Sequence, residues 1–177
     1  MIKNKNNSDF LHFECIWLIK HFRKGKLIWS IEKENVIPLE GTKAILDTLY
    51  RNQGATYFTN TNFYVGLYKG TVSKATTLAI ISGLEPTGGD YARKLCERST
   101  STAGWPELED STGFWRVISK EIEFEAVGGT IGPVGGAFLC TAETGGAGTL
   151  FNLVAMGIER TILAGDIAII QIKVKAK

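Results

Sequence analysis

The stretch from Ile118 to Ala126 reads Ile-Ser-Lys-Glu-Ile-Glu-Phe-Glu-Ala, so that apolar and acidic residues alternate along most of it. A second stretch, 166–177, reads Asp-Ile-Ala-Ile-Ile-Gln-Ile-Lys-Val-Lys-Ala-Lys, and from Ile170 on its apolar residues alternate with Gln171, Lys173, Lys175 and Lys177. A period of two is typical of a strand that buries one face. We therefore expect two strands, one with an acidic and one with a basic outer face. If they were neighbours, each opposed charge pair would add only about 0.2–1 kcal/mol.

Three groups of glycines lie between these two stretches, at 128–136, 145–148 and 165, and each separates short apolar runs. Glycine supplies the positive φ of tight turns and bulges. A phosphate-binding loop would instead place its glycines between a strand and a helix and end in Gly-Lys-Ser or Gly-Lys-Thr. Residues 128–136 run between two expected strands and contain no lysine. We therefore predict turns between strands at these glycines.

The N-terminal third predicts a β-hairpin from residues 10–19 and 27–37, both rich in aromatic and β-branched residues, with a turn at Arg23-Lys24-Gly25-Lys26. Trp17 and Trp29 would be cross-strand neighbours. Period-two alternation defines its inward face, which comprises Leu11, Phe13, Cys15, Trp17 and Ile19 on the first strand and Leu27, Trp29 and Ile31 on the second.

The middle of the chain predicts one short helix near 42–53, with Thr42 as its N-cap and Gly54 after its end. A strand is expected at 63–69, whereas 76–82 fits a strand or a helical turn. Residues 83–113 read as a long surface loop, of the kind that carries a working or interface surface.

This pattern predicts a mainly β protein, an antiparallel β-sandwich or jelly roll with one short helix. At 177 residues, one domain over residues 10–177 is expected, after a polar N-terminal arm at 1–9. Such an arm can be disordered or can lace onto a neighbouring subunit.

Charge and cysteine content exclude several classes of protein. Twenty basic and eighteen acidic residues give a net charge of +2 without a basic block, so no nucleic-acid partner is indicated. The first apolar stretch is interrupted by charged residues and histidines, which fits neither a signal peptide nor a membrane helix. We expect a protein that stays in the cytoplasm where it is made. Cys15, Cys96 and Cys140 are too scattered for a disulfide framework or a zinc site.

The sequence offers no catalytic constellation, and we predict no enzyme and no catalytic, cofactor-binding or metal-binding residue. His12 and His21 fall on opposite faces of the hairpin, so they cannot share a site. Glu121, Glu123 and Glu125 stand at roughly 7 Å steps, as a pair of glycosidase carboxylates would, but regular alternation is typical of a solvated strand face.

Four aromatic residues, Tyr91, Trp105, Phe114 and Trp115, lie in or beside the long loop. We interpret them as core or subunit-interface residues, with a sugar-stacking platform as the alternative.

The order of motifs resembles small virion structural proteins of tailed bacteriophages: head decoration, head fibre or tail proteins. The resemblance extends over about residues 10–177 and concerns turns and core strands, so it assigns no functional residue. The segments that carry it are Leu27-Ile28-Trp29, the helix from Gly41 to Leu49, Phe63–Tyr68, Glu85-Pro86 through Arg93, Gly129–Leu139, and Gly165-Asp166 with the terminal strand.

The resemblance implies a component of the virion, assembled in the host cytoplasm. Our first expectation is a capsid decoration (cement) protein that binds the major capsid protein or other virion proteins through multivalent contacts, as a homo-oligomer such as a trimer, without nucleic acid or membrane. The alternatives are a neck, connector or tail-fibre adaptor and, from another class, a carbohydrate-binding module.

Overall fold

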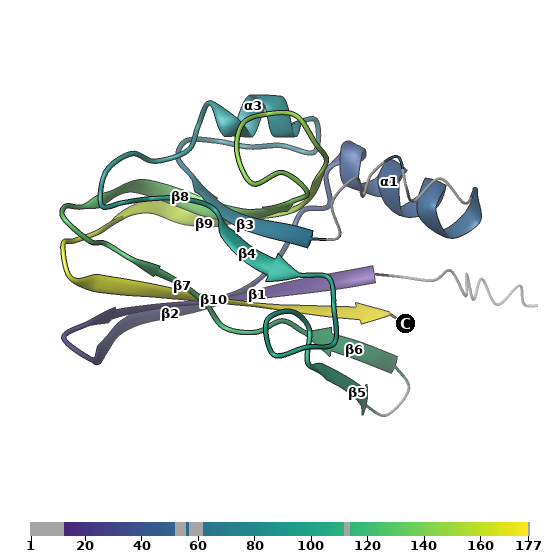
Figure 1. The fold of residues 1–177 in the computed structure, drawn as a ribbon, viewed down its shortest axis with the longest axis horizontal. Helices are drawn as coiled ribbons and strands as arrows, with labels where there is room; N and C mark the ends of the chain where they lie inside the picture. Colours follow the sequence, from purple (N-terminus) through teal and green to yellow (C-terminus); the bar gives the residue numbers. More distant parts are fainter. Residues whose placement is uncertain (1–12, 52–55, 57–61, 112–113, 177) are drawn as a thin grey trace, which may run out of the picture.

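The computed structural model describes residues 13–51, 56, 62–111 and 114–176, and it shows two antiparallel sheets packed face to face (Figure 1). Sheet A consists of β1 (Phe13–Arg23), β2 (Lys26–Glu34), β5 (Glu107–Ser111), β6 (Phe114–Ile118), β7 (Ile122–Glu125) and β10 (Asp166–Ala176). Sheet B consists of β3 (Asn62–Tyr68), β4 (Lys94–Glu97), β8 (Ile131–Cys140) and β9 (Leu150–Ile162).

The strand order is β2-β1-β10-β6-β5 in sheet A, with β7 also paired to β10, and β4-β3-β8-β9 in sheet B. The inner faces of both sheets form the main core, which includes Trp17, Phe124, Ile170 and Ile172. Their alternation with polar residues is the pattern that predicted the strands. The expected mainly β, antiparallel sandwich is confirmed.

The first hairpin is confirmed as β1 and β2, joined by Lys24 and Gly25, whose φ angles of 49° and 73° suit a tight hairpin turn. The predicted partnership of Trp17 and Trp29 is wrong, because strands joined at Lys24-Gly25 place Lys33 opposite Trp17 and His21 opposite Trp29.

The inward face of the hairpin is confirmed in part. Cys15, Trp17 and Ile19 are buried, and Trp29 and Ile31 are partly buried against the core. Leu27 lies beyond a register shift between His21 and Phe22 and is 54% exposed. Leu11, His12 and the side chain of Phe13 lie outside the described residues.

The predicted helix exists as α1 (Leu39–Tyr50), but its start is wrong by three residues. Pro38 is the N-cap, and Thr42 lies inside the helix, where its hydroxyl donates to the Pro38 carbonyl. Gly41 is the reason for the misplaced start, because a glycine within a helix reads as a boundary. Here it permits close packing, since a Cβ at this position would lie 2.4 Å from the Phe151 carbonyl oxygen. The predicted terminator, Gly54, lies outside the described residues.

The prediction of a continuous loop over 83–113 is wrong, because β4 and β5 lie within it. Both strands are short, and β5 reads Glu-Leu-Glu-Asp-Ser, a composition too polar to show a buried face. The undecided segment 76–82 contains a helical turn, α3 (Leu78–Ser82), which Thr77 caps.

The strand predicted from Ile118 onward is two strands, since residues 119–121 separate β6 from β7. The backbone N–H of Ile172 donates to the Ser119 hydroxyl at 2.9 Å, which ties this break to β10. β7 and β10 are neighbours, but Glu123 and Glu125 stand opposite Ile169 and Ile167, so no charge pairs form across them.

The central strands of sheet B, β3 and β8, are buried on both faces over most of their length, which explains their continuous apolar runs. Tyr64, Tyr68 and Phe138 face a second apolar cluster beneath α3, whereas Val65 and Leu67 face the main core. Gly136 in β8 belongs to this packing, because a Cβ there would lie 2.1 Å from the Val154 carbonyl oxygen. The glycines at 128–129, 145–148 and 165 lie between strands, as predicted, whereas Gly132, Gly135 and Gly136 lie within β8, where the pairing is irregular and the predicted turn is wrong.

Candidate functional site

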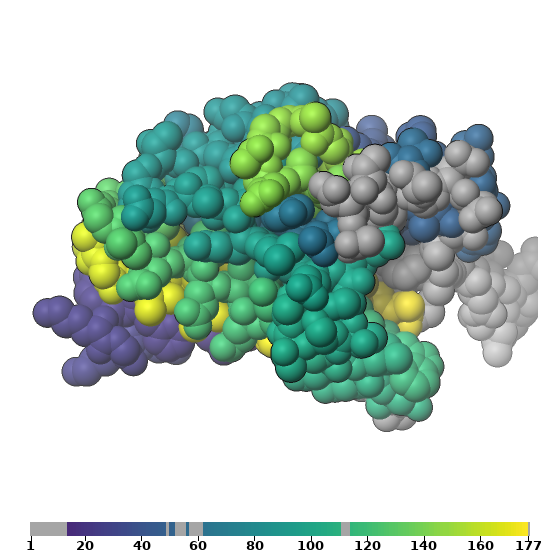
Figure 2. Space-filling model, in the orientation of Figure 1, coloured from purple at the N-terminus to yellow at the C-terminus, as the bar shows by residue number. Residues whose placement is uncertain are grey.

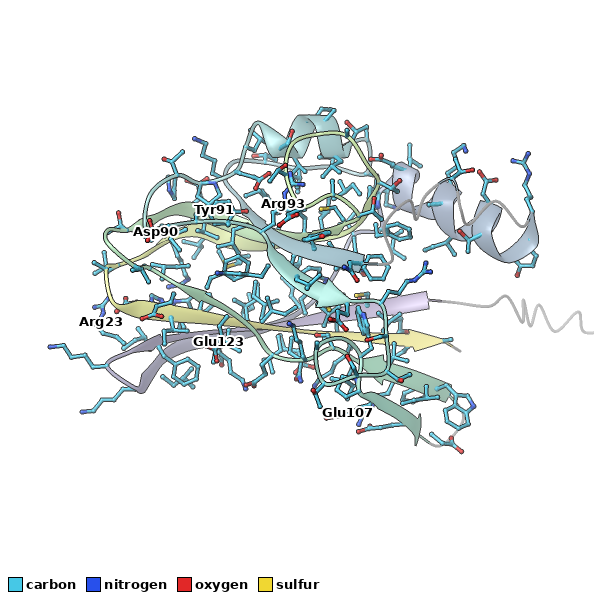
Figure 3. All side chains as sticks on the ribbon, viewed as in Figure 1. Arg23, Asp90, Tyr91, Arg93, Glu107 and Glu123 are labelled. Atoms are coloured by element: carbon cyan, nitrogen blue, oxygen red, sulfur yellow. The ribbon has the colours of Figure 1, made fainter. Side chains whose placement is uncertain are left out.

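A buried polar cluster occupies the end of sheet A where the β1–β2 and β9–β10 turns lie, which we call the turn end; Arg23 marks it in Figure 3. Asp166 accepts hydrogen bonds from Arg23 at 2.9–3.1 Å and contacts His21 Nε2 at 2.9 Å. On its other side, His21 Nδ1 accepts a hydrogen bond from Trp29 Nε1 at 2.9 Å. The guanidinium of Arg160 lies 4.4 Å from the centre of the Trp29 ring.

This cluster is a structural network and offers no base for catalysis. An indole N–H can only donate, so Nδ1 of His21 accepts the hydrogen bond from Trp29. Nε2 of His21 therefore carries the ring proton and donates a hydrogen bond to Asp166. Both ring nitrogens are therefore engaged, and the histidine is 4% exposed. The hydrogen bonds from Arg23 hold the pKa of Asp166 below its usual range, which keeps this buried carboxylate charged.

A second saturated network fixes the start of β4 to the loops on the outer side of sheet B (Figure 3). Arg93 binds Glu85 and also donates to the carbonyl oxygens of Ala142 and Gly145, each at 2.7 Å. Tyr91 donates to Glu85 at 2.9 Å, and burial followed by the Glu85 charge raises the pKa of Tyr91. These groups satisfy one another and leave none directed at solvent.

The three cysteines Cys15, Cys96 and Cys140 are all free and buried. Burial raises the pKa of Cys15 to about 12 and those of Cys96 and Cys140 to about 11. A thiol of this kind is a poor nucleophile at neutral pH.

The opposite end of the sandwich is different, because the β5–β6 hairpin extends sheet A beyond the cover of sheet B (Figure 1). In Figure 2 this hairpin and the preceding loop project from the lower right of the molecule. Cross-strand pairing places Leu108 opposite Val117, Val117 opposite Val174, and Val174 opposite Cys15. These four residues form one apolar row on the inner face of sheet A. We call this row and the pocket above it the open end.

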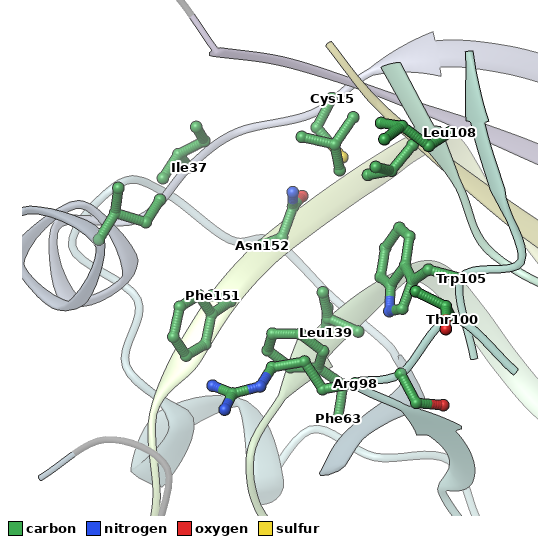
Figure 4. A pocket seen from close by; sticks show the side chains of 14 residues that line it. Cys15, Ile37, Phe63, Arg98, Thr100, Trp105, Leu108, Leu139, Phe151 and Asn152 are labelled. Carbon is green, nitrogen blue, oxygen red and sulfur yellow. The ribbon is translucent and has the colours of Figure 1, made fainter. Parts of the chain in front are cut away.

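The pocket at the open end has a volume of about 430 Å³, within the range of ligand-binding cavities (Figure 4). The apolar row forms one wall. The other walls consist of Ile37, Ile45, Phe63, Arg98, Ser99, Thr100, Trp105, Leu139, Phe151 and Asn152.

The polar groups of this pocket are few, and two of them are informative. The side-chain oxygen of Asn152 is occupied, since it accepts hydrogen bonds from Trp17 Nε1 and from Asn35. Trp105 Nε1, in contrast, is buried and has no hydrogen-bond partner among the described residues. A buried donor without a partner is costly, so the site fits an occupant that brings an acceptor.

The aromatic residues singled out in the sequence do not form one exposed platform. Tyr91 stacks on Phe124 in the interior, and Trp105 packs edge-on against Phe63. Phe114 lies under the Lys175 ammonium group, whereas Trp115 is 54% exposed on the hairpin. Trp105 does line the pocket, together with Leu108 of β5, a strand that lies within the predicted loop.

The three alternating glutamates lie on the exposed face, as a solvated strand predicts. Glu121 forms an ion pair with Lys20 at 3.4 Å. Within the described part of the chain no three acidic, histidine or cysteine side chains gather as metal ligands, and no helix there is long and apolar enough to cross a membrane.

Comparison with known proteins gives one family. Residues 41–175 match the family described as Podophage GP4 fiber I protein gp80. No curated protein matches the chain, and no solved structure does. The matched region includes every strand except β1 and β2, and it contains most of the open end. The chain therefore belongs to this podophage fibre protein family and is a structural protein of a tailed-phage virion.

Proposed function

We propose that this chain is a non-enzymatic subunit of a virion fibre, and that its open end binds other virion proteins. The family description supports a fibre, which is nearest to the alternative of a neck, connector or tail-fibre adaptor in the sequence analysis, whereas capsid decoration stays a prediction. The observation that carries the contact surface is the apolar pocket with its unpaired Trp105 N–H.

Exposed apolar side chains on the two elements beside the pocket extend this surface. Leu46 and Tyr50 on α1 are 50% and 71% exposed, and Leu108 and Trp115 on the β5–β6 hairpin are 65% and 54% exposed. Figure 1 shows both elements at the same end of the sandwich. Aromatic and aliphatic anchors of this kind are enriched at the centres of protein interfaces.

Copy number and position in the virion test the proposal. Purified particles would be analysed by quantitative mass spectrometry with the major capsid protein as the internal standard, and antibody fragments against the chain would be located by electron microscopy. A small, fixed number of copies on fibres is expected. Copies that scale with the capsid lattice would instead assign the chain to capsid decoration and overturn the fibre proposal.

Sugar recognition through Trp105 or Trp115 is tested on the same protein. The proposal predicts no saturable binding on a broad glycan array. Glycan binding that Trp115→Ala abolishes, while the fold is retained, would identify a carbohydrate-binding module instead.

A further inference from the structure

The open end constrains the chemistry of its occupant. The row from Leu108 to Cys15 requires apolar side chains, and the buried N–H of Trp105 requires a hydrogen-bond acceptor. A peptide segment supplies both, because its side chains can be apolar while its backbone carbonyls accept. In Figure 4 the Trp105 ring stands at the wall of the pocket, beside Thr100 and facing Leu139.

The chain itself contains a segment with these properties. Residues 1–12 precede β1, outside the described residues, and carry the adjacent apolar pair Phe10-Leu11 after a polar run at 3–9. β1 begins at Phe13, two residues before Cys15, which lines the pocket. β1 therefore begins at the end of the sandwich where the pocket lies.

Chain geometry argues against insertion of this pair into the pocket of its own molecule. Phe13 is still paired with Ala176, so β1 is extended at its first residue. Reversal of a chain takes four residues, which here would be Phe10–Phe13. The polar run at 3–9 would then reach the apolar row, and the match in chemistry would be lost.

We propose that the pocket at the open end binds the Phe10-Leu11 segment of a second copy of this chain, with a backbone carbonyl of that arm accepting from Trp105 Nε1. This proposal rests on the proposed function, because it names a partner for the contact surface proposed there. Exchange of arms between copies links subunits without requiring any new folded element. Such a link suits a protein that contacts further copies of itself.

Photo-crosslinking of the full chain provides the direct test. Benzoylphenylalanine replaces Phe10, copies labelled with ¹⁴N and ¹⁵N are mixed before association, and crosslinked peptides are analysed by mass spectrometry. Crosslinks between residue 10 and peptides from β5 or the Trp105 loop are expected, with about half of them isotopically mixed. Crosslinks that are isotopically pure, or that avoid the pocket, overturn the proposal. The same group at Ile2 serves as the control and should give no pocket crosslinks.

Self-association of matched variants provides the second test, by analytical ultracentrifugation. Phe10→Ser combined with Leu11→Ser should weaken association at least about tenfold, whereas Ile2→Ser should leave it unchanged. On the pocket side, Leu108→Asp should produce a similar loss. Its control is Ile158→Asp, because Ile158 is 67% exposed on β9, in the half of that strand toward the turn end. Leu108 is itself 65% exposed, so its replacement does not endanger folding.

The outcomes separate this inference from the proposed function. A chain that remains monomeric at every concentration, or whose association ignores both arm and pocket variants, overturns arm exchange. Location on fibres within the virion would still hold in that case. Conversely, arm exchange with copies spread over the capsid lattice would refute the fibre role alone.

Discussion

The turn end and the open end of the sandwich differ in whether their buried polar groups have hydrogen-bond partners. At the turn end, Asp166, His21 and Trp29 form a chain of hydrogen bonds in which each buried group has a partner. At the open end, Trp105 keeps a buried N–H without a partner among the described residues, beside an apolar pocket of about 430 Å³. Both ends belong to the same sheet, so the fold alone does not explain the difference.

The difference teaches which end is available for binding. Saturated buried polar groups rigidify a structure and offer nothing to a partner. An unpaired donor beside exposed apolar surface reduces the stability of the free subunit, and a partner recovers that loss on binding. Substitutions at the saturated sites should therefore affect folding, whereas substitutions at the open end should affect association.

The largest effect is expected at Arg93, whose network belongs to the saturated class. Arg93→Met should lower the free energy of unfolding by about 3–5 kcal/mol, because it leaves Glu85 and two carbonyl oxygens without their donor in a buried site. Urea denaturation followed by fluorescence measures the change. Arg116→Met is the matched control, since the Arg116–Glu109 pair is partly exposed and should contribute less than about 1 kcal/mol. Equal losses of unfolding free energy in the two variants would contradict the distinction between the buried Arg93 network and the partly exposed Arg116–Glu109 pair.

Trp17 and Trp105 both have a buried indole N–H, and the same substitution by phenylalanine compares them. Trp17→Phe removes a hydrogen bond to Asn152 from a fully buried site and should cost about 2 kcal/mol of unfolding free energy. Trp105→Phe removes an N–H that has no partner and should change stability by less than about 0.5 kcal/mol. Thermal and urea denaturation measure both. A larger loss at Trp105 would show that its N–H is satisfied within the subunit.

Low pH should reduce the contribution of Asp166, at the turn end, to the free energy of unfolding. Its pKa is lower in the folded than in the unfolded chain, so its contribution is present above its ordinary value, about 4, and is lost as pH falls through the folded pKa. The difference in unfolding midpoint between the wild type and Asp166→Asn should therefore shrink below about pH 4. A difference that stays constant down to pH 2 would contradict this role of Asp166.

The parts of the fold that the sequence predicted are those in which one strand buries one face. β10 and β7 follow a strict period of two, and the hairpin turn has its glycine where a positive φ is required. Sheet B was harder, because Tyr68 and Leu67 are both buried, on opposite faces. A strand covered on both sides has no alternation to detect.

The candidate site could be predicted only in part for a related reason. Trp105 and Trp115 stood out as aromatics in an apparent loop, but the pocket depends on the alignment of Leu108, Val117 and Val174 across three strands. Those residues lie far apart in the sequence, and β5 is too polar to be recognised as a strand. The separation of Trp17 from Trp29, in contrast, follows from the turn itself, because strands joined at Lys24-Gly25 cannot bring positions 17 and 29 opposite each other.

The smallest effect on stability is expected at Trp115, at the exposed side of the open end. Trp115→Ser should change the free energy of unfolding by less than about 0.5 kcal/mol, because the side chain is more than half exposed and surface substitutions of this kind are nearly neutral. Chemical denaturation measures this, with Leu27→Ser, 54% exposed on β2 toward the turn end, as the control. The two variants should be alike in stability and differ in binding to virion partners, which only Trp115→Ser should weaken. A strong destabilisation by Trp115→Ser would mean that the hairpin is part of the subunit's own core, and the open end would lose its role as a contact surface.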